Sequence, residues 1–325
     1  MVRARPTFSE RRFHAWLAGR FGRRSGSVLP LGDDTSATPL GGGRVALLTT
    51  DALSEGTHFL PASPPDAIGR AAAGASLSDI AAKGGRPVAL LLDLLLPSDT
   101  PERWARAVAG GAARAAEAHG AALVGGDTKP AARRAVVGTI LGIGRADRLA
   151  PRAGARPGDL LVVTGTVGRG GWAARSVLAG RPPGPADLRR MLDVRPRCRE
   201  GPELVRWAHA MLDTSDGLGD SARLLAEASH VAVTVEMARL PLFAGLRGVR
   251  SPEARREMAL YGGDYELLAT LRRSDLPRAQ ASLRRLGCPL TVVGEVRRGR
   301  GAWFVEDGRR RPMPPGGWQP FEALG

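Results

Sequence analysis

A segment rich in proline and glycine, residues 150–158, constrains the fold most, because it separates two halves that each mix strand-like and helix-like patterns. In the first half we predict strands at 45–50, 87–96, 123–124 and 135–143 and helices at 66–83 and 101–119. In the second half we predict strands at 160–164, 210–212, 231–235, 265–271, 290–296 and 302–305 and helices at 171–179, 199–209, 218–228, 252–260 and 275–286. The sequence therefore predicts an α/β (α+β) protein of two domains, residues 1–148 and 149–325.

Residues that start or stop elements support these boundaries. The Gly41-Gly42-Gly43 run predicts a turn into the first strand. Asp66 follows two prolines and is a candidate N-cap, and Gly84-Gly85 is a candidate stop for the same helix. Pro101 suits the first turn of the next helix.

The charge of the chain comes almost entirely from arginine. Among 325 residues, 47 are Lys or Arg and 32 are Asp or Glu, which gives a formal net charge of +15. Only two of these cations are lysines, Lys83 and Lys129. The arginines form short, scattered clusters without interleaved aromatic residues, so the pattern indicates a compositional bias and argues against a nucleic-acid surface.

The sequence shows no membrane segment and no cysteine framework. No uncharged apolar run reaches the roughly 18 residues of a membrane helix, and no apolar core follows the basic N-terminus. Cys198 and Cys288 form no C-x-x-C pattern, which argues against a disulfide framework or a structural zinc site. We therefore expect a cytoplasmic protein with neither a membrane nor a nucleic-acid partner.

Acidic residues recur in short turns flanked by glycine, serine or threonine. These turns hold Asp33, Asp34, Asp51, Asp127, Asp213, Asp216 and Asp264, and Asp79 lies near the end of a predicted helix. Taken singly, each is explained as a turn residue or a cap, and Asp216 suits the helix that begins at Leu218. Taken together, they are the oxygen ligands with which a phosphoryl-transfer enzyme holds Mg²⁺ against a polyphosphate.

Other common catalytic patterns are missing. The sequence has no G-x-x-x-x-G-K-[ST], so it does not encode a P-loop enzyme. The glycine-rich run from Gly165 to Gly171 lacks a lysine and does not match G-x-G-x-x-G, so it predicts a strand-to-helix turn. Of the five histidines only His58 lies in a motif-like segment, and no nucleophilic triad is evident.

Seven motifs, in this order and spacing and over nearly the whole chain, resemble the thiamine-monophosphate kinase family. That family shares a superfamily with aminoimidazole ribonucleotide synthetase and selenophosphate synthetase. The motifs are Leu31-Gly-Asp-Asp34, Thr49-Thr-Asp51 with Glu55-Gly-Thr-His58-Phe59, Ser76-Leu-Ser-Asp-Ile-Ala-Ala-Lys-Gly84, Leu123-Val-Gly-Gly-Asp-Thr128, Pro151-Arg-Ala-Gly-Ala-Arg-Pro-Gly-Asp159, Leu212-Asp-Thr-Ser-Asp-Gly-Leu218 and Gly262-Gly-Asp-Tyr-Glu-Leu-Leu268.

The resemblance implies a fold, an assembly and a reaction. The fold is that of the two-domain aminoimidazole ribonucleotide synthetase-like proteins, and the assembly is a homodimer in which the N-terminal strands of two subunits form one shared barrel. The reaction is the Mg²⁺-assisted, direct in-line transfer of the ATP γ-phosphoryl group to thiamine monophosphate, which yields thiamine diphosphate. The implied cofactors are several Mg²⁺ ions, and ATP is the co-substrate.

The resemblance also implies roles for individual residues, carried over by motif position. The implied metal ligands are Asp34, Thr49, Thr50, Asp51, Asp79, Asp127, Asp213 and Asp216, of which Asp51, Asp127 and Asp216 are expected to be catalytic. The implied ATP contacts are Gly126, Asp127, Arg152 and Ser215, and the implied substrate contacts are His58, Gly263 and Trp318. An aromatic face at Trp318 suits a cationic thiazolium ring, although a tryptophan that simply fills a groove is the alternative.

Two departures from the family pattern leave other functions open. Gly263 stands where the family has a substrate-contacting Glu, so Asp264 or Glu266 compensates or the acceptor differs. The helix near Ala109 also lacks an aromatic residue that many members place beside the nucleotide. The alternatives are an ATP-dependent kinase or synthetase of the same superfamily that acts on another small molecule, and a non-catalytic nucleotide-binding paralogue.

Overall fold

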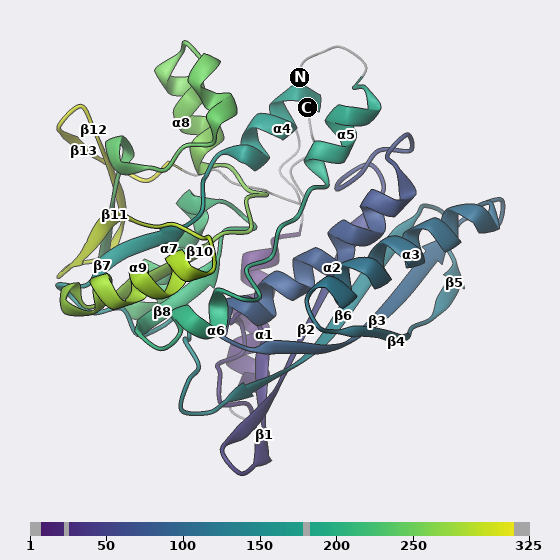
Figure 1. Cartoon of the computed structure of the whole chain (residues 1–325), viewed down its shortest axis with the longest axis horizontal. Coiled ribbons are helices and arrows are strands. Elements are labelled where there is room, and N and C mark those ends of the chain that lie inside the picture. The colour runs from purple at the N-terminus through teal and green to yellow at the C-terminus, as the bar shows by residue number, and fades with distance from the viewer. Residues whose placement is uncertain (1–7, 23–25, 178–182, 315–325) are drawn as a thin grey trace.

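The computed structural model describes residues 8–22, 26–177 and 183–314 and arranges them around two β-sheets. Figure 1 shows the first sheet, β1 to β6, beside the second sheet, β7 to β13. The predicted α/β character is confirmed. The boundary between residues 148 and 149 stays a prediction; the first sheet's last strand ends at Arg145 and the second sheet's first strand begins at Leu160.

The first sheet is mixed in strand direction. Its strands run in the order β1-β2-β6-β3-β4, and β5 pairs with the far end of β3. They are β1 (Ser36–Gly41), β2 (Arg44–Ser54), β3 (Arg86–Leu96), β4 (Ala122–Gly125), β5 (Thr128–Pro130) and β6 (Ala135–Arg145). The glycines at 41–43 have positive φ and turn β1 into β2, as their sequence indicates.

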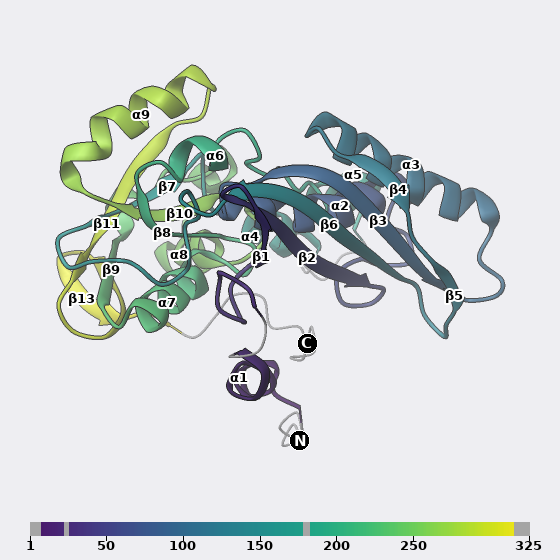
Figure 2. The same ribbon diagram turned by 90° about the horizontal axis from the view of Figure 1, so that it is seen from below.

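Two helices cover one face of this sheet (Figure 2). They are α2 (Pro65–Ala82) and α3 (Glu102–Ala118), each within a residue or so of the predicted range. The helices approach backbone to backbone: a Cβ at Gly69 would lie 1.9 Å from the carbonyl oxygen of Val108, and one at Gly111 would lie 2.1 Å from that of Asp66. Only glycine fits at these two positions.

The opposite face of the first sheet is open and apolar. In β2 the residues alternate, so that Leu47 is buried under the helices while Leu48 faces away and is 44% exposed. The other exposed large apolar residues of this sheet are Leu40, Val88, Leu91 and Val124. A contiguous apolar face of this kind on a sheet is typical of an interaction surface.

The second sheet, in contrast, is covered on both faces. Its order is β13-β12-β9-β11-β7-β10-β8, antiparallel except for β12 beside β9. The strands are β7 (Leu160–Thr164), β8 (Ala208–Asp213), β9 (Ala232–Glu236), β10 (Leu267–Leu271), β11 (Leu290–Arg297), β12 (Gly301–Glu306) and β13 (Arg309–Pro312). One face packs on α7 (Leu218–Ser229) and α8 (Pro252–Leu260), and the other packs on α6 (Gly201–Leu204) and α9 (Leu276–Arg285).

One predicted helix is wrong for most of its length. The pattern at 199–209 predicts a long helix, but α6 ends at Leu204 and β8 begins at Ala208. The reason is tertiary, because Ala208 pairs with Leu271 of β10 and extends the sheet. Asp66 is likewise not the N-cap of α2: Pro64 takes that place, and Asp66 lies in the first turn.

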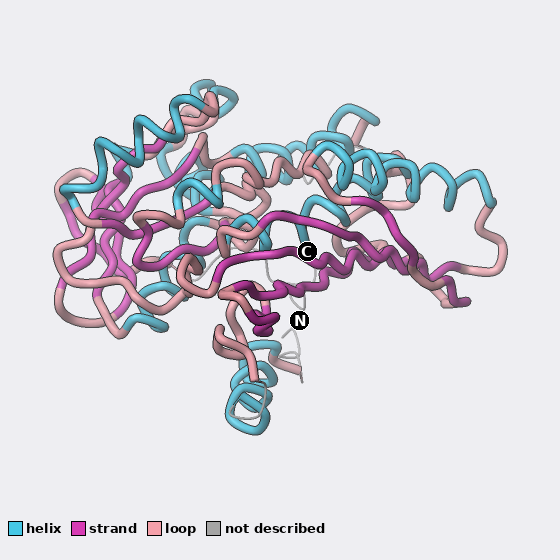
Figure 3. Tube along the Cα trace, turned by 60° about the horizontal axis from the view of Figure 1, so that its bottom comes forward, coloured by secondary structure: helices cyan, strands magenta, loops and turns pink. Residues whose placement is uncertain are grey.

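Three further α-helices are present among the described residues. α4 (Arg169–Val177) and α5 (Pro185–Met191) pack on each other, and the sequence patterns did not indicate α5. α1 (Glu10–Phe21) projects away from both sheets (Figures 2 and 3) and carries the exposed aromatic residues Phe13, Trp16 and Phe21. No helix among the described residues has the length and apolar character needed to cross a membrane.

Candidate active site

Four predicted carboxylates come together where the two sheets meet. They arrive from four separate segments: Asp34 from the loop before β1, Asp51 from β2, Asp79 from α2 and Asp213 from the end of β8. Burial and the nearby charges of Asp213 and Asp34 raise the pKa of Asp51 to about 6, although a hydrogen bond from Ser76 opposes the shift. Burial and the charge of Asp51 likewise raise the pKa of Asp79 well above its ordinary value.

Hydroxyl groups hold these carboxylates in place. The Ser76 hydroxyl donates to Asp51 (2.8 Å), and the Thr49 hydroxyl donates to Asp79 (2.6 Å). The Ser78 hydroxyl crosses to the second half of the chain and donates to Asp213 (2.6 Å). The motif Ser76-Leu-Ser-Asp79 on α2 therefore contributes one carboxylate and aligns two others.

The Asp213-Thr-Ser-Asp216 turn adds a further carboxylate at the exposed side of this group. Ser215 donates both its backbone N–H (3.2 Å) and its hydroxyl (2.6 Å) to Asp213. Asp216 reaches the surface, yet partial burial and the charges of Asp213 and Asp220 raise its pKa to about 7. Asp216 does not cap α7, since the N-cap position belongs to Gly217.

Asp33 and Asp34 differ from these groups because they face cations. The ammonium of Lys83 lies 2.7 Å from Asp33 and 2.9 Å from Asp34. Arg152 also binds Asp34, with Nε 2.7 Å from Oδ1, and its backbone N–H donates to Asp33 (3.0 Å). Burial alone would raise the pKa of Asp34, but the charges of Arg152 and Lys83 hold it below its ordinary value.

Thr49 and Thr50 point to opposite faces of the first sheet. Thr49 faces α2 and contacts Asp79, whereas the Thr50 hydroxyl pairs with that of Thr139 (2.9 Å) on the open face. A hydroxyl role for Thr50 in the same metal site as Asp79 does not fit this orientation. Its role as a ligand stays a prediction that rests on its backbone carbonyl.

Asp127 and Gly126 lie apart from the carboxylate group, at the edge of the first sheet. The Asp127 side chain is 58% exposed, and its Oδ1 lies 2.7 Å from the ammonium of Lys129. That hydrogen bond, with one from the Thr128 N–H, lowers the pKa of Asp127. Gly126 is pressed against β3, where a Cβ would lie 1.8 Å from the carbonyl oxygen of Leu92.

His58 lies in the loop after β2. Its Nδ1 accepts a hydrogen bond from the Ser54 backbone N–H (3.2 Å), so Nε2 carries the proton of the neutral ring. Burial lowers the pKa of His58, and the side chain is therefore neutral at pH 7. In this form it can donate one hydrogen bond to a phosphate or a ring nitrogen.

Gly263 has a backbone that suits glycine alone. Its φ is +90°, its N–H donates to the Ser215 carbonyl (2.7 Å), and a Cβ there would lie 3.3 Å from the Cα of Gly170.

Neither carboxylate that was expected to replace the missing Glu, Asp264 or Glu266, is free to bind a substrate. Asp264 accepts from the N–H groups of Gly168 and Gly170, and Glu266 is bound by Arg197 and Thr164. Trp318 lies outside the described residues.

Sequence reasoning assigned no role to two residues that the structure places in the site. Lys83 is completely buried against Asp33 and Asp34, and its signal was its rarity in an arginine-rich chain. Tyr265 is the second: burial and the charges of Asp51 and Asp213 raise the pKa of its phenol, which therefore lies beside these carboxylates. Its backbone has a positive φ of 55°, which is rare for a residue with a side chain.

The donor set fits Mg²⁺. The groups are carboxylate and hydroxyl oxygens, and burial and neighbouring carboxylates raise the pKa values of Asp51, Asp79 and Asp213, so a bound cation would stabilise their charged forms. Among the described residues, no three acidic, histidine or cysteine side chains converge closely enough to enclose an ion by themselves. Phosphate oxygens and water would therefore complete the coordination, as is usual for Mg²⁺.

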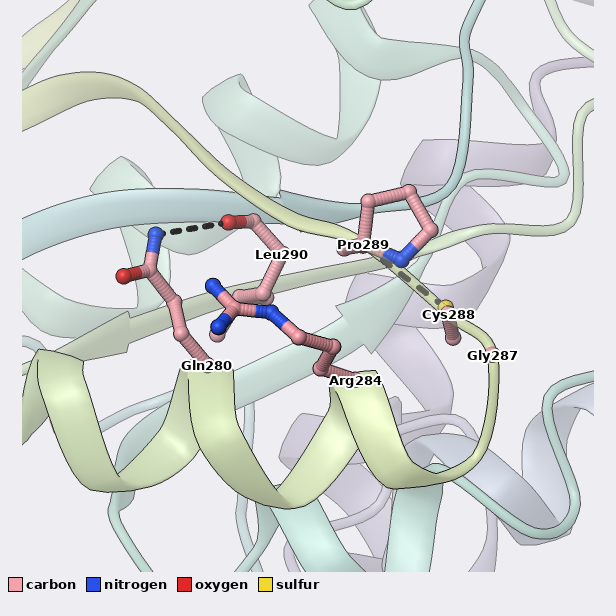
Figure 4. Close-up of a pocket in the computed structure, with 6 residues that line it drawn as sticks. All are labelled: Gln280, Arg284, Gly287, Cys288, Pro289 and Leu290. Atoms are coloured by element: carbon pink, nitrogen blue, oxygen red, sulfur yellow. Dashed lines mark hydrogen bonds between the residues drawn. The ribbon is translucent and has the colours of Figure 1, made fainter.

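Two cavities lie outside this group of carboxylates. One of about 310 Å³ lies between α9 and the start of β11, beside Arg284 and Cys288 (Figure 4), and no predicted site residue lines it. The other, of about 410 Å³, follows the His58 loop and is lined by Pro61, Trp104 and Arg134 among others. The Arg134 guanidinium stacks 5.1 Å from the centre of the Trp104 ring.

Comparisons with known proteins agree with this geometry. The models of the AIR synthase related protein family match residues 32–145 (N-terminal domain) and 156–305 (C-terminal domain). Thiamine-monophosphate kinase of Pyrococcus horikoshii is 30% identical over 273 residues, covering 84% of this chain and 85% of the relative. That of Escherichia coli K12 is 32% identical over 288 residues, covering 86% of this chain and 88% of the relative.

Solved structures match over an even larger share of the chain. The structure of AaThiL complexed with AMPPCP and TMP superposes with a TM-score of 0.81 at 29% identity, covering 96% of this chain and 98% of that one. A protein from Thermus thermophilus superposes with a TM-score of 0.83 at 33% identity, covering 94% and 98%. The hydrogenase maturation protein HypE of E. coli, at 21% identity and a TM-score of 0.72, shares the fold.

Proposed function

The chain belongs to the AIR synthase related proteins and, among them, to the thiamine-monophosphate kinases, and we propose how its residues perform the ATP-dependent phosphorylation of thiamine monophosphate. The observation that carries the proposal is the meeting of Asp34, Asp51, Asp79 and Asp213 between the two sheets. Lys83 and Arg152 balance Asp34, whereas the pKa values of Asp51, Asp79 and Asp213 are raised, so a cation bound with a polyphosphate would stabilise these three in their charged form.

In the reaction, an oxygen of the thiamine monophosphate phosphate attacks the γ-phosphorus of ATP. The bond from the γ-phosphorus to the β,γ-bridging oxygen breaks, and ADP leaves with the electron pair. Since the acceptor oxygen is already ionised, no general base is needed, and alignment and charge neutralisation supply the catalysis. Mg²⁺ held by Asp51, Asp79, Asp213 and Asp216 would offset the phosphate charge there.

Arg152 and Ser215 are proposed to meet the nucleotide. Arg152 stands at the edge of the carboxylate group with a quarter of its side chain exposed, and it is bound to Asp34. A polyphosphate offers a competing partner for this guanidinium. Transfer of Arg152 from Asp34 to phosphate would free a carboxylate oxygen at the moment when a metal ligand is required.

The open face of the first sheet supports the homodimer that the family resemblance implies. Leu48, Val88 and Leu91 are each 44% exposed and Val124 is 61% exposed, and in β2 and β3 the neighbouring residues Leu47, Leu90 and Leu92 are buried on the helix-covered face. Pairing of this face with the same face of a second copy removes it from water. It also gives Asp127 and Gly126, which lie at the edge of that sheet away from their own chain's carboxylates, a route to the partner's site.

The test is an ATP- and Mg²⁺-dependent assay that follows thiamine diphosphate directly, with free thiamine as a parallel acceptor. Product from the monophosphate alone is expected. Full rate in excess chelator would overturn the metal-assisted mechanism. A mixed dimer of Asp127→Asn and Asp216→Asn chains tests the contribution of the second copy: activity above that of either variant alone is expected if Asp127 acts across the interface.

A different acceptor is the second candidate, and Gly263 is the observation that favours it. The positive φ at this residue and its contact with Gly170 leave no place for the family's Glu without local rearrangement. Calorimetric binding of ATP with no product from thiamine monophosphate would favour this alternative.

A further inference from the structure

Lys83 is the feature of the site that the proposed function leaves unexplained. It is one of two lysines in a chain that otherwise uses arginine for positive charge, and its side chain is completely buried. It follows directly after α2, four residues beyond Asp79, and so lies on the same side of the helix. The negative end of the helix dipole is at this point, which favours a cation.

Four oxygen atoms surround the Lys83 ammonium. Two are carboxylate oxygens, of Asp33 (2.7 Å) and Asp34 (2.9 Å). Two are backbone carbonyl oxygens, of Ala150 (3.0 Å) and Met211 (2.7 Å). The ammonium donates hydrogen bonds to the two carbonyl oxygens and lies at ion-pair distance from the two carboxylates, and the four oxygens belong to three separate segments of the chain.

The four oxygens connect both halves of the molecule. The aspartates precede β1 of the first sheet, Ala150 lies between the two sheets, and Met211 is in β8 of the second sheet, two residues before Asp213. Lys83 itself closes α2, the helix that carries Asp79. One ammonium group thus fixes the segments that supply Asp34, Asp79 and Asp213.

Arginine could not take this place. A planar guanidinium spreads its donors in a fixed fork, whereas a lysine ammonium is a compact point charge that oxygens can surround from several directions. Carboxylate and carbonyl oxygens are also the groups with which proteins coordinate hard cations. This difference gives a physical reason for one buried lysine in a chain with 45 arginines.

We propose that Lys83 is a built-in monovalent cation: its tethered ammonium neutralises Asp33 and Asp34, joins the two halves at the site and positions Asp34, Asp79 and Asp213. Lys83 is therefore a positioning residue that does not touch substrate. Without the lysine, the four oxygens form a site for a free ammonium or a similar monovalent cation.

The test removes the tether and supplies the cation separately. Lys83→Ala deletes three carbons and the ammonium, and n-propylammonium contains these same atoms. We expect the variant to melt about 5 °C lower or more than wild type, because it leaves buried carboxylates with too little positive charge. We expect turnover to fall by about tenfold or more, because the carboxylates lose their alignment.

Adding n-propylammonium or ammonium chloride is expected to restore both quantities in Lys83→Ala, whereas tetramethylammonium chloride at the same ionic strength is not. Wild type should respond equally to all three salts. Lys83→Met is the matched control, because methionine fills most of the same space but carries no charge, so this variant should be impaired and not rescued. Lys129→Met, at the exposed lysine, should acquire no cation dependence of its melting temperature.

Several results would overturn the proposal. Failure of every monovalent cation to raise the melting temperature of Lys83→Ala is one, and a Lys83→Met variant as stable and active as wild type is another. If Lys83→Ala folds only when n-propylammonium is present, recovery of folding becomes the supporting readout, and no recovery in any salt counts against it. The turnover measurement rests on the proposed function, whereas the melting-temperature measurement does not. A failure of the proposed function is therefore distinguishable from a failure of the proposed role of Lys83.

Discussion

The carboxylates between the two sheets form two sets that differ in how their charge is balanced. Asp33 and Asp34 face Lys83 and Arg152, and the pKa of Asp34 is lowered. In the second set, burial and the charges of neighbouring carboxylates, Asp34 among them, raise the pKa of each member. This set consists of Asp51, Asp79 and Asp213, which accept hydrogen bonds from hydroxyl groups, and Asp216. The chain thus supplies the cations for the first set and leaves the second to be balanced by what binds.

This difference separates structure from function within one site. Asp33, Asp34 and Lys83 are paired before any ligand arrives, so they stabilise the junction of the two halves. The unbalanced set weakens the fold by its own repulsion, and such a cost is typical of groups kept for chemistry. Substitutions within either set and changes of pH should therefore remove this difference or make it measurable.

The largest effect is expected from Asp51→Asn, which removes a charge from the unbalanced set. Turnover should fall by about 10³-fold, because a group that holds the charge-balancing cation is lost. Stability should not fall, since the change also removes repulsion. Steady-state assays and thermal melts check both, and wild-type turnover in this variant would remove Asp51 from the site.

Arg152→Gln, unlike Asp51→Asn, should lower the stability of the fold. It strips the balanced set of one cation, and the free energy of unfolding should fall by about 3 kcal/mol, the lower end for breaking a buried pair, because Arg152 is partly exposed. Denaturant unfolding measures this change, with the exposed Arg298→Gln as a control that should leave stability unaltered. Equal stability of the two variants would contradict the assignment.

The pH dependence of stability distinguishes the two sets without mutation. A carboxyl whose folded pKa is raised favours the folded state when protonated. Asp51, at about 6, should therefore add about 1.4 kcal/mol to the stability of metal-free protein as pH falls from 8 to 5, and Asp216 should add to this gain. Asp34, with a lowered pKa, loses its contribution only below its ordinary pKa. Mg²⁺ with nucleotide should flatten the curve between pH 5 and 8. Asp51→Asn should reduce its slope only in part, because Asp216, with a pKa of about 7, still titrates in this range. A flat curve in metal-free wild type would be inconsistent with the unbalanced set.

The smallest effect is expected from Lys129→Met. This lysine also pairs with an aspartate, but the pair is exposed, at 65% for Lys129 and 58% for Asp127. Exposed ion pairs contribute little to stability. The melting temperature should therefore remain that of wild type, in contrast to Lys83→Ala, and a comparable loss in both variants would show that burial is not what distinguishes the two lysines.

Much of the fold and part of the site could be predicted from local patterns. The helix at 252–260 and the strand at 160–164 agree with α8 and β7 residue for residue. Strand alternation also suffices to place Thr49 and Thr50 on opposite faces, because side-chain direction in a strand has a period of two. The aspartates stand out in the sequence because they are few and lie in glycine-flanked turns.

Only the tertiary structure decided which charges meet. Ser78 contacts Asp213 from 135 positions away, and Lys83 reaches Met211 from 128 positions away; no local spacing encodes either pair. The same packing ends α6 early to extend a sheet and leaves Asp127 apart from the other carboxylates. Local spacing determines the direction of a side chain within its own element, but its charge environment depends on how separate elements pack. The sequence by itself therefore determined most of the helices and strands and the positions of the acidic residues. Tertiary packing decided which carboxylates the chain neutralises and which it leaves for its ligands.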